Sequence, residues 1–176
     1  FNFMKGENAE NPYGTIIGKN AFFRAISDLE NLEFTEEADI ASCVKNCPNT
    51  GRNNGITVIV SDFFTESNWK QAVDYLCYQN RQVLLVQVLA PEEINPNYDG
   101  RIHMIDAESL DLADPKNMKL KITRARHLAY EEALKDFRED IKSFCSKRGV
   151  DYISISSDTP IERVLFGELL KVGIMA

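Results

Sequence analysis

The stretch that decides the predicted fold is Asn54-Gly-Ile-Thr-Val-Ile-Val-Ser-Asp-Phe-Phe-Thr-Glu-Ser-Asn-Trp-Lys70. Its apolar, β-branched run over 56–60 is typical of a strand that is buried on both faces. The run ends in the polar pair Ser61 and Asp62, and Thr65 is then expected to open a helix as its N-cap. Ligands of open α/β sheets bind beyond the carboxyl ends of the strands, so Asp62 is a candidate site residue. A turn or helix-capping role for this carboxylate is the simpler alternative.

The residues that follow complete a β-α-β unit. Apolar residues recur at i, i+3, i+4, i+7 and i+8 from Trp69 to Cys77, which predicts an amphipathic helix that ends near Asn80. The apolar segment 82–90 is then a second buried strand. One helix between two such strands predicts parallel pairing with a right-handed crossover. The predicted fold class is therefore α/β.

Further elements are expected on both sides of this unit. The N-terminal part predicts the tail of a strand over 1–4, a loop over 5–14, helices over 19–31 and 36–45, and a polar turn over 47–55. The C-terminal part predicts a loop over 91–100, an antiparallel hairpin of strands 101–106 and 118–122 appended to the main sheet, a helix from its cap Thr123 to Lys147, a third core strand over 152–155, and a last helix. Thr159 and Glu162 predict a capping box for the last helix, with Pro160 at its first helical position.

The periodicity also predicts which side chains these helices bury. The predicted buried residues are Ile40, Cys43 and Val44 in the second helix; Leu128, Ala133, Leu134, Phe137, Ile141, Phe144 and Cys145 in the helix after Thr123; and Ile161, Val164, Leu165 and Leu169 in the last helix. Ser156, Ser157 and Asp158 follow the third core strand. Because the carboxyl ends of parallel strands meet at one edge, we expect this second polar cluster on the same edge as Asp62.

Length and composition set limits on the class of protein. A chain of 176 residues with 44% hydrophobic residues is expected to form a single domain over 1–176. Its 20 basic and 27 acidic residues give a net charge of −7, which repels polyanions and disfavours nucleic-acid binding. No signal peptide and no apolar run of about 18 residues is present, so we expect a cytoplasmic segment without direct membrane contact. Because position 1 is not Met, a longer parent with a membrane anchor is an open alternative.

Cysteine, histidine and motif chemistry give little support for catalysis. The four cysteines, Cys43, Cys47, Cys77 and Cys145, are interpreted as reduced core thiols. His103 and His127 lack metal-ligand spacing and are interpreted as surface or packing residues. No phosphate loop, nucleophile elbow or zinc-protease motif is present. A hard cation such as Mg²⁺ remains possible, since Ser61, Asp62 and Asp39 carry suitable oxygen ligands.

Five phrases occur in order between residues 60 and 162, within a resemblance that covers roughly residues 14–175. They are Val60-Ser-Asp-Phe-Phe64, Leu84-Leu-Val-Gln-Val-Leu-Ala-Pro-Glu-Glu-Ile-Asn-Pro96, Met104-Ile-Asp-Ala-Glu108, Ser143-Phe-Cys-Ser-Lys-Arg-Gly-Val-Asp-Tyr152 and Ser157-Asp-Thr-Pro-Ile-Glu162. Together they resemble the bacterial family called domain of unknown function 58, a branch of the von Willebrand factor A-like proteins. The resemblance implies a Rossmann-like three-layer α/β/α sandwich of von Willebrand factor A type, N-terminally truncated, whose top edge carries a metal-ion-dependent adhesion site.

The same resemblance implies that this metal site is incomplete here. Asp62 matches the Asp of the third ligand loop, and Asp39 matches the Asp that usually follows the second-loop Thr, but Ala38 stands where that Thr would be. The Asp-x-Ser-x-Ser loop and the first strand are absent from these residues. We therefore expect Asp62, Ser61 and Asp39 to form a degenerate site without a well-bound Mg²⁺. The missing strand would lie beside 56–60, so we expect that edge to be covered by the N-terminal segment or by a second copy of the chain, as a homodimer.

Three functional hypotheses follow. The first is a non-enzymatic protein-interaction or assembly module that works with a MoxR-type AAA+ ATPase, because members of the family that the chain resembles often accompany such ATPases. The second is a Mg²⁺-dependent hydrolase or phosphotransferase that uses Asp62 with Ser61 and Asp158. The third is a structural domain whose strand-end rim has no binding role.

Overall fold

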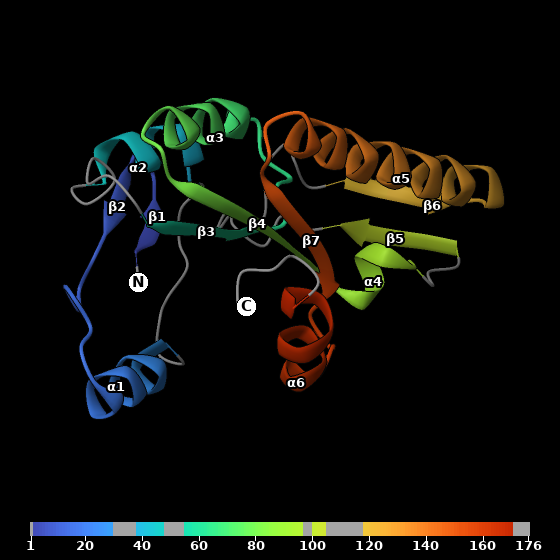
Figure 1. Cartoon of the computed structure of the whole chain (residues 1–176). Helices are drawn as coiled ribbons and strands as arrows, with labels where there is room; N and C mark the ends of the chain where they lie inside the picture. The colour runs from blue at the N-terminus through green and yellow to red at the C-terminus, as the bar shows by residue number, and fades with distance from the viewer. Residues whose placement is uncertain (1, 30–37, 48–54, 97–99, 105–117, 171–176) are drawn as a thin grey trace. The chain divides into compact units, whose positions relative to one another are not determined.

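The computed structural model describes residues 2–29, 38–47, 55–96, 100–104 and 118–170, and its elements are labelled in Figure 1. The chain divides into two compact units, each described here by itself. The first comprises Phe1–Gly51, Thr65–Tyr75 and Ile105–Met118. The second comprises Arg52–Phe64, Leu76–Met104 and Lys119–Ala176.

A parallel three-stranded sheet forms the centre of the second unit. Its strands are β3 (Ile56–Ser61), β4 (Gln82–Leu89) and β7 (Asp151–Ser156), in the order β3-β4-β7. Both pairings are parallel, and in this register Ser61 lies beside Gln87, which lies beside Ser154. The predicted parallel α/β core and its three strands are therefore confirmed.

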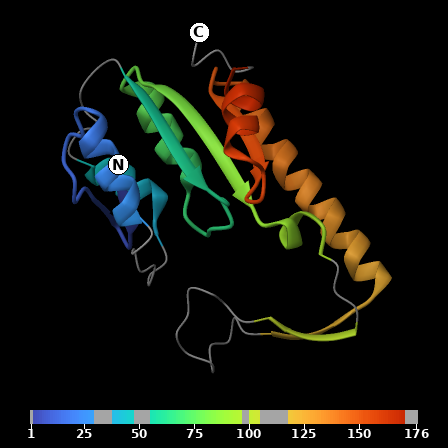
Figure 2. The same ribbon diagram turned by 90° about the horizontal axis from the view of Figure 1, so that it is seen from below.

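Helical segments of the second unit pack on the part of this sheet formed by β4 and β7. Leu84, Val86 and Ile153 form a buried cluster on one face, and Leu169 of the C-terminal helix η1 (Val164–Leu169) packs against it. The long helix α5 (Arg124–Ser146) runs beside β7, as Figures 1 and 2 show. The alternation of side chains along β4 therefore divides its apolar residues between two helical layers.

The helices α3 (Trp69–Tyr78) and α5 both end in a Schellman motif. After α3, Arg81 N–H donates to the Leu76 carbonyl and Asn80 N–H donates to the Cys77 carbonyl, and Asn80 has a φ of 56°. After α5, Val150 and Gly149 repeat the arrangement, and Gly149 has a φ of 65°. The left-handed residue turns the chain directly into β4 in one case and β7 in the other.

The start of the first unit contains a hairpin where the sequence predicts a loop. β1 (Phe3–Lys5) and β2 (Asn8–Glu10) pair antiparallel, with Lys5 beside Asn8. Gly6, between them, has a φ of 52°, which glycine adopts without strain. The loop prediction over 5–14 is therefore wrong in part, because a short Gly-containing turn was not recognised as a hairpin signal.

The two helices of the first unit compare differently with their predictions. Helix α1 (Lys19–Leu29) confirms the first predicted helix, whose last residues lie outside the described part of the chain. Helix α2 (Ile40–Asn46) begins at Ile40, because Ala38 bridges to Gly6 and Asp39 is an extended N-cap. The predicted start of α2 at 36 is therefore wrong for the described residues, whereas burial of its apolar side chains is confirmed, namely Ile40, Cys43 and Val44.

Thr65 does not open the helix that follows β3. Helix α3 begins only at Trp69, whose N–H donates to the Ser67 carbonyl. The Ser67 N–H donates to Thr65 Oγ1 over 3.0 Å. The N-cap prediction is wrong because the Thr65 hydroxyl stabilises a local turn of the chain instead of a helix.

The last helix also differs from its prediction. Pro160 is the N-cap of α6 (Ile161–Arg163) and not its first helical residue, and no side chain caps this end. The Thr159 N–H donates to the Ser156 carbonyl, so Thr159 belongs to the turn after β7 and the predicted capping box is wrong. The helix then widens into the π-helix η1, which buries Val164, whereas Ile161 of α6 is 62% exposed.

Three further predictions have mixed outcomes. Thr123 caps α5 as predicted. Four residues of the predicted core face of α5 are buried, namely Leu134, Ile141, Phe144 and Cys145. Leu128 and Ala133, which were predicted to be buried, are exposed. The strands β5 (Gly100–Met104) and β6 (Met118–Ile122) pair with each other in a separate two-stranded sheet. A short helix, α4 (Pro91–Ile94), replaces the start of the loop predicted over 91–100.

The strand β3 is a terminal strand of its sheet, since among the described strands it pairs only with β4. Its side chains on one face remain accessible, namely Ile56, Val58 and Val60. This agrees with the expectation that β3 has an open edge. Its covering by the N-terminal segment or by a second copy stays a prediction.

The left-handed residue after α5 gives a stability test. We expect Gly149→Ala to lower the free energy of unfolding by about 1 kcal/mol, because an added Cβ is strained at a positive φ. Open space surrounds this position, so backbone conformation and not a steric clash would cause the loss. Urea unfolding measures the change, with Ser146→Ala in the last turn of α5 as the control. Equal stability of wild type and Gly149→Ala would contradict the assigned motif.

Candidate functional site

Three strand ends meet at one edge of the parallel sheet in the second unit. Asp62 follows β3, Ala90 follows β4, and Asp158 comes two positions after the end of β7. The Ser157 N–H donates to the Leu89 carbonyl over 2.9 Å, which joins the turn after β7 to the end of β4. Asp62 and Asp158 are both exposed. The prediction that both carboxylates lie on one rim is confirmed, with the end of β4 between them.

The turn that presents Asp62 is fixed by its own hydrogen bonds. The Asp62 carboxylate accepts the Phe64 N–H through Oδ1 over 2.9 Å, and Ser61 Oγ accepts the Phe63 N–H over 3.0 Å. Phe63 has a φ of 62°, which is uncommon for a bulky residue, and its side chain is only 1% exposed. Burial of this ring offsets the backbone strain, so the turn has one preferred conformation.

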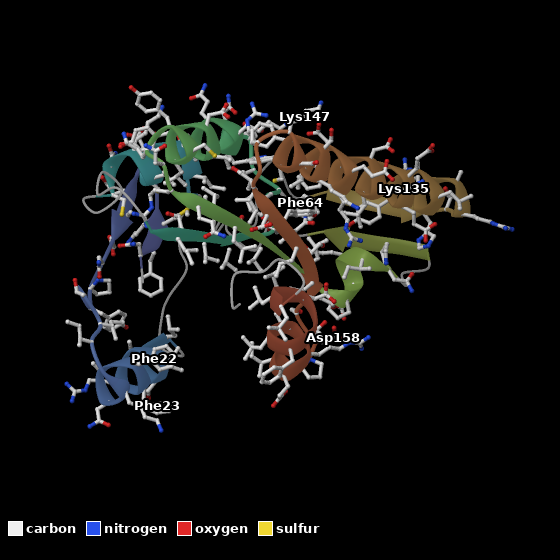
Figure 3. All side chains as sticks on the ribbon, in the orientation of Figure 1. Phe22, Phe23, Phe64, Lys135, Lys147 and Asp158 are labelled. Carbon is white, nitrogen blue, oxygen red and sulfur yellow. The ribbon has the colours of Figure 1, made fainter. Side chains whose placement is uncertain are left out.

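An aromatic side chain lies directly after this turn. Phe64 is 47% exposed, and its ring stacks on Phe137 of α5 with centroids 5.3 Å apart and an interplanar angle of 28°. Figure 3 labels Phe64 and Asp158 among the side chains of the chain. The stacking holds the Phe64 ring in place while part of its surface faces solvent. A carboxylate and an accessible aromatic ring are thus presented close together.

A buried amide connects the three strands beneath this turn. Gln87 of β4 is 0% exposed, and its Nε2 donates to the Asp62 carbonyl over 2.9 Å. Its Oε1 accepts a hydrogen bond of 2.6 Å from the Tyr152 hydroxyl of β7. Burial raises the pKa of Tyr152, which favours the neutral phenol that this hydrogen bond requires.

Asp39, the third predicted ligand, is the N-cap of α2 in the first unit. Its Oδ1 accepts from Ser67 Oγ over 2.8 Å and from Ser42 N–H over 3.1 Å, and its Oδ2 accepts from Ser42 Oγ over 3.0 Å. The Ser67 hydroxyl, followed by the Ser42 groups, lowers the pKa of Asp39 below 3.8. These donors stabilise the ionised carboxylate and the start of the helix.

Mg²⁺ requires near-octahedral coordination by oxygen atoms, so the predicted ligands must have oxygens that are free to bind it. The carboxylate of Asp39 already accepts three hydrogen bonds, and the Ser61 hydroxyl faces the Phe63 N–H. Of the three predicted ligands, only Asp62 has an exposed carboxylate at the rim of the sheet. Over the described ranges, no group of three or more His, Cys, Asp or Glu side chains is placed to hold an ion. As they stand, these residues do not fit a complete Mg²⁺ ligand set, and the expectation of a degenerate site without a well-bound ion stays a prediction.

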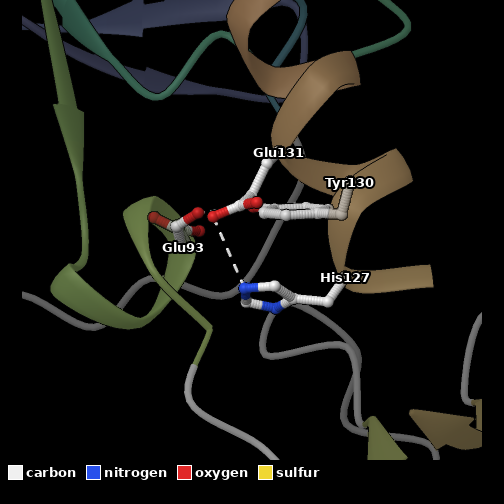
Figure 4. Close-up of polar contacts among 4 residues, drawn as sticks. All are labelled: Glu93, His127, Tyr130 and Glu131. Carbon is white, nitrogen blue, oxygen red and sulfur yellow. Dashed lines mark hydrogen bonds and ion pairs between the residues drawn. The ribbon is translucent and has the colours of Figure 1, made fainter. Parts of the chain in front are cut away.

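A second polar cluster joins α5 to α4, as Figure 4 shows. The Tyr130 hydroxyl donates to the Glu93 carbonyl over 2.7 Å, and His127 Nε2 lies 3.4 Å from Glu131 Oε1. Burial, followed by the charge of Glu93, raises the pKa of Tyr130. The His127 and Glu131 side chains are 29% and 47% exposed, so this is a surface pair of small energy. The interpretation of His127 as a surface residue is confirmed, and the side chain of His103 lies outside the described residues.

The cysteines behave as the sequence predicts. All four are free, and Cys43, Cys47 and Cys145 are buried. Burial raises the pKa of Cys145 to about 12 and also raises the pKa of Cys43. Protonated, buried thiols are poor nucleophiles and poor metal ligands. The interpretation as reduced core thiols is confirmed for these three, whereas Cys77 is free but only half-buried.

Sequence reasoning missed Gln87, Tyr152 and Ser67, which hold the two predicted carboxylate sites in position. One signal was available for Gln87, because it is the single polar residue inside the apolar run 83–90. A polar side chain in a buried strand must find hydrogen-bond partners, and those partners lie at strand ends. No local pattern identifies Tyr152 or Ser67, since their partners are far away in the sequence.

The capping interactions of Asp39 give a pH-dependent prediction. We expect Ser67→Ala to raise the pKa of Asp39 toward 3.8 and to lower stability at pH 7 by about 1 kcal/mol, because one hydrogen bond to the carboxylate is lost. The contribution of a lowered carboxyl pKa is present above pH 3.8 and disappears as the pH falls through the folded-state value. The stability difference should therefore shrink in acid. Carboxyl NMR titration and urea unfolding at several pH values measure both effects, with exposed Ser143→Ala as control, and an unchanged Asp39 pKa would contradict the assignment.

Comparisons with known proteins complete the description of the chain. Among the described residues, no helix is both long enough and apolar enough to cross a membrane. No curated protein and no solved structure is significantly similar to this chain. A family model described as protein of unknown function DUF58 matches residues 3–140, which is more than half of the sequence. The chain therefore belongs to the DUF58 family.

Proposed function

We propose that this chain is a non-enzymatic protein-interaction module whose binding surface is the rim around Asp62. The observation that supports this most is the turn itself. An exposed carboxylate lies beside the half-exposed ring of Phe64, and the buried ring of Phe63 anchors both. Binding to a surface that is already ordered costs less conformational entropy, so a rigid charged and aromatic rim favours association. Aromatic side chains are also enriched at the centres of protein interfaces.

The finer fold and the partner are part of the same proposal. We interpret the parallel sheet with helical layers on both faces as part of a Rossmann-like sandwich of von Willebrand factor A type. Domains that resemble it bind partner proteins at the corresponding edge, and relatives by resemblance accompany MoxR-type AAA+ ATPases. This analogy supports a MoxR-type AAA+ ATPase as the partner, with the chain acting in the cytoplasm.

The role of metal in this proposal is limited. The contacts of Asp39 and Ser61 favour structural use of their oxygens, so binding by this chain is proposed not to require a tightly held Mg²⁺. In the alternative hydrolase or phosphotransferase hypothesis, Asp62, Ser61 and Asp158 would surround the ion. Because β4 lies between β3 and β7, Asp62 and Asp158 follow strands that are two spacings apart, roughly 10 Å. This arrangement lends the enzymatic alternative no particular support.

The direct test is the affinity of the chain for the purified MoxR-type AAA+ ATPase of the same organism. We expect Asp62→Asn and Phe64→Ala each to weaken binding by about tenfold or more, as residues at interface centres do. Asp62→Asn keeps an oxygen acceptor for the Phe64 N–H, so the turn should persist. Asp136→Asn on α5 and Phe166→Ala on η1 are matched controls on exposed positions.

Two outcomes would contradict the proposal. Equal affinity of wild type, Asp62→Asn and Phe64→Ala would leave the rim without a binding role. Turnover of a generic phosphate ester with Mg²⁺, abolished by Asp62→Asn, would favour the enzymatic alternative. Circular dichroism and thermal unfolding of each variant exclude loss of fold as the cause of weaker binding.

A further inference from the structure

Gln87 occupies a position where a polar side chain is costly. It is the one buried polar residue of the described chain, and it lies in β4 between the buried Val86 and the partly buried Val88. A buried amide without hydrogen-bond partners would lower the free energy of unfolding by roughly 1–3 kcal/mol. Its hydrogen bonds therefore determine whether the strand tolerates it.

The orientation of this amide is forced by its partners. The Asp62 carbonyl can only accept, so the Gln87 Nε2 must face it, as the 2.9 Å contact shows. The Gln87 Oε1 then faces Tyr152, whose hydroxyl must donate over 2.6 Å. The Tyr152 hydroxyl carries one proton, and Gln87 Oε1 is the acceptor that it contacts. The single hydroxyl proton is thus donated to Gln87.

This chain of hydrogen bonds reaches the candidate binding residue through its backbone. Gln87 holds the carbonyl of Asp62, and the carboxylate of the same residue accepts the Phe64 N–H. Release of the carbonyl would free the peptide between Asp62 and Phe63, where the backbone is already strained at a φ of 62°. The carboxylate would then lose its fixed position at the rim.

We propose that Gln87 and Tyr152 are positioning residues that hold the Asp62 carboxylate in its binding orientation. The importance of this role for association rests on the proposed function, whereas the positioning itself does not. A hydroxyl on β7 orients an amide on β4, and the amide fixes the turn after β3. The three strands of the sheet thereby act together on one exposed carboxylate.

The positioning is tested by hydrogen exchange in the whole chain. Phe64 N–H is the reporter, because it donates to the Asp62 carboxylate. We expect Gln87→Met and Tyr152→Phe each to lower its protection factor by about tenfold or more, since each variant leaves a buried group without its partner. Gln71→Met and Tyr78→Phe are the matched controls, because both side chains are exposed on α3. The core amide of Leu85 reports any general loss of stability.

Gln87→Glu separates positioning from packing. When protonated, the introduced carboxyl group can donate to the Asp62 carbonyl and accept from Tyr152, so Phe64 protection should match that of wild type at low pH. When ionised, it can no longer donate, and two acceptors face each other. Protection of Phe64 should therefore fall as the pH rises, at a higher pH than an exposed Glu side chain would titrate, because burial raises a carboxyl pKa. A purely structural role would not give this reversible dependence.

The outcomes distinguish this inference from the proposed function. Unchanged Phe64 protection in Gln87→Met and Tyr152→Phe would overturn the positioning role, as would an equal loss at Leu85. If Asp62→Asn weakens ATPase binding tenfold while Gln87→Met lowers Phe64 protection but leaves binding intact, the proposed function stands and the importance of the positioning for association fails. If Asp62→Asn has no effect on binding, the proposed function fails, and the exchange data still decide whether Gln87 holds the turn.

Discussion

The parallel register of β3, β4 and β7 is the constraint on which the rest of the second unit depends. It places Gln87 beside Ser61 on one side and Ser154 on the other, so one amide reaches both neighbouring strands. A shift of one residue would move Gln87 to the opposite face, among the residues that pack on η1. The buried hydrogen bonds of Gln87 therefore specify the register, and the register in turn decides which residues form the rim.

The ends of helices α3 and α5 determine where strands β4 and β7 begin. Asn80 after α3 and Gly149 after α5 adopt left-handed conformations that end each helix just before a strand. The apolar strands supply most of the burial, while these turns set where each strand begins. Asp39 fixes the start of α2 in the first unit, where it accepts two hydrogen bonds from Ser42 in the first helical turn and a third from Ser67 outside the helix. The two carboxylates thus have different roles. The Asp39 carboxylate caps helix α2, whereas the Asp62 carboxylate remains exposed at the rim.

Much of the architecture could be predicted from the sequence, because burial leaves a periodic signal. The runs at 56–60 and 82–90 identify two core strands, Thr123 identifies the start of α5, and the shared rim of Asp62 and Asp158 follows from parallel pairing. Helix starts were less predictable. Thr65 and Thr159 are residues of the type that favours helix N-caps, yet both belong to turns. A short hydroxyl side chain is compatible with a helix N-cap and with a turn. The exposure of Leu128 also depends on how far α5 extends beyond the sheet, which its periodicity does not record.

The candidate site was predictable only in part. Asp62 stands where strand polarity places ligands, but its supports come from residues far away in sequence, and a left-handed, buried phenylalanine has no local signature. The interruption of β4 by a single glutamine was the one visible sign of a buried network.

The most direct test of this account is an NMR measurement of nuclear Overhauser effects across the sheet. The account predicts contacts from β3 to β4 and from β4 to β7 in parallel register, with Gln87 amide protons close to Asp62 and to the Tyr152 ring. Antiparallel contacts, or a register in which the Gln87 side chain lies on the face covered by η1, would contradict it.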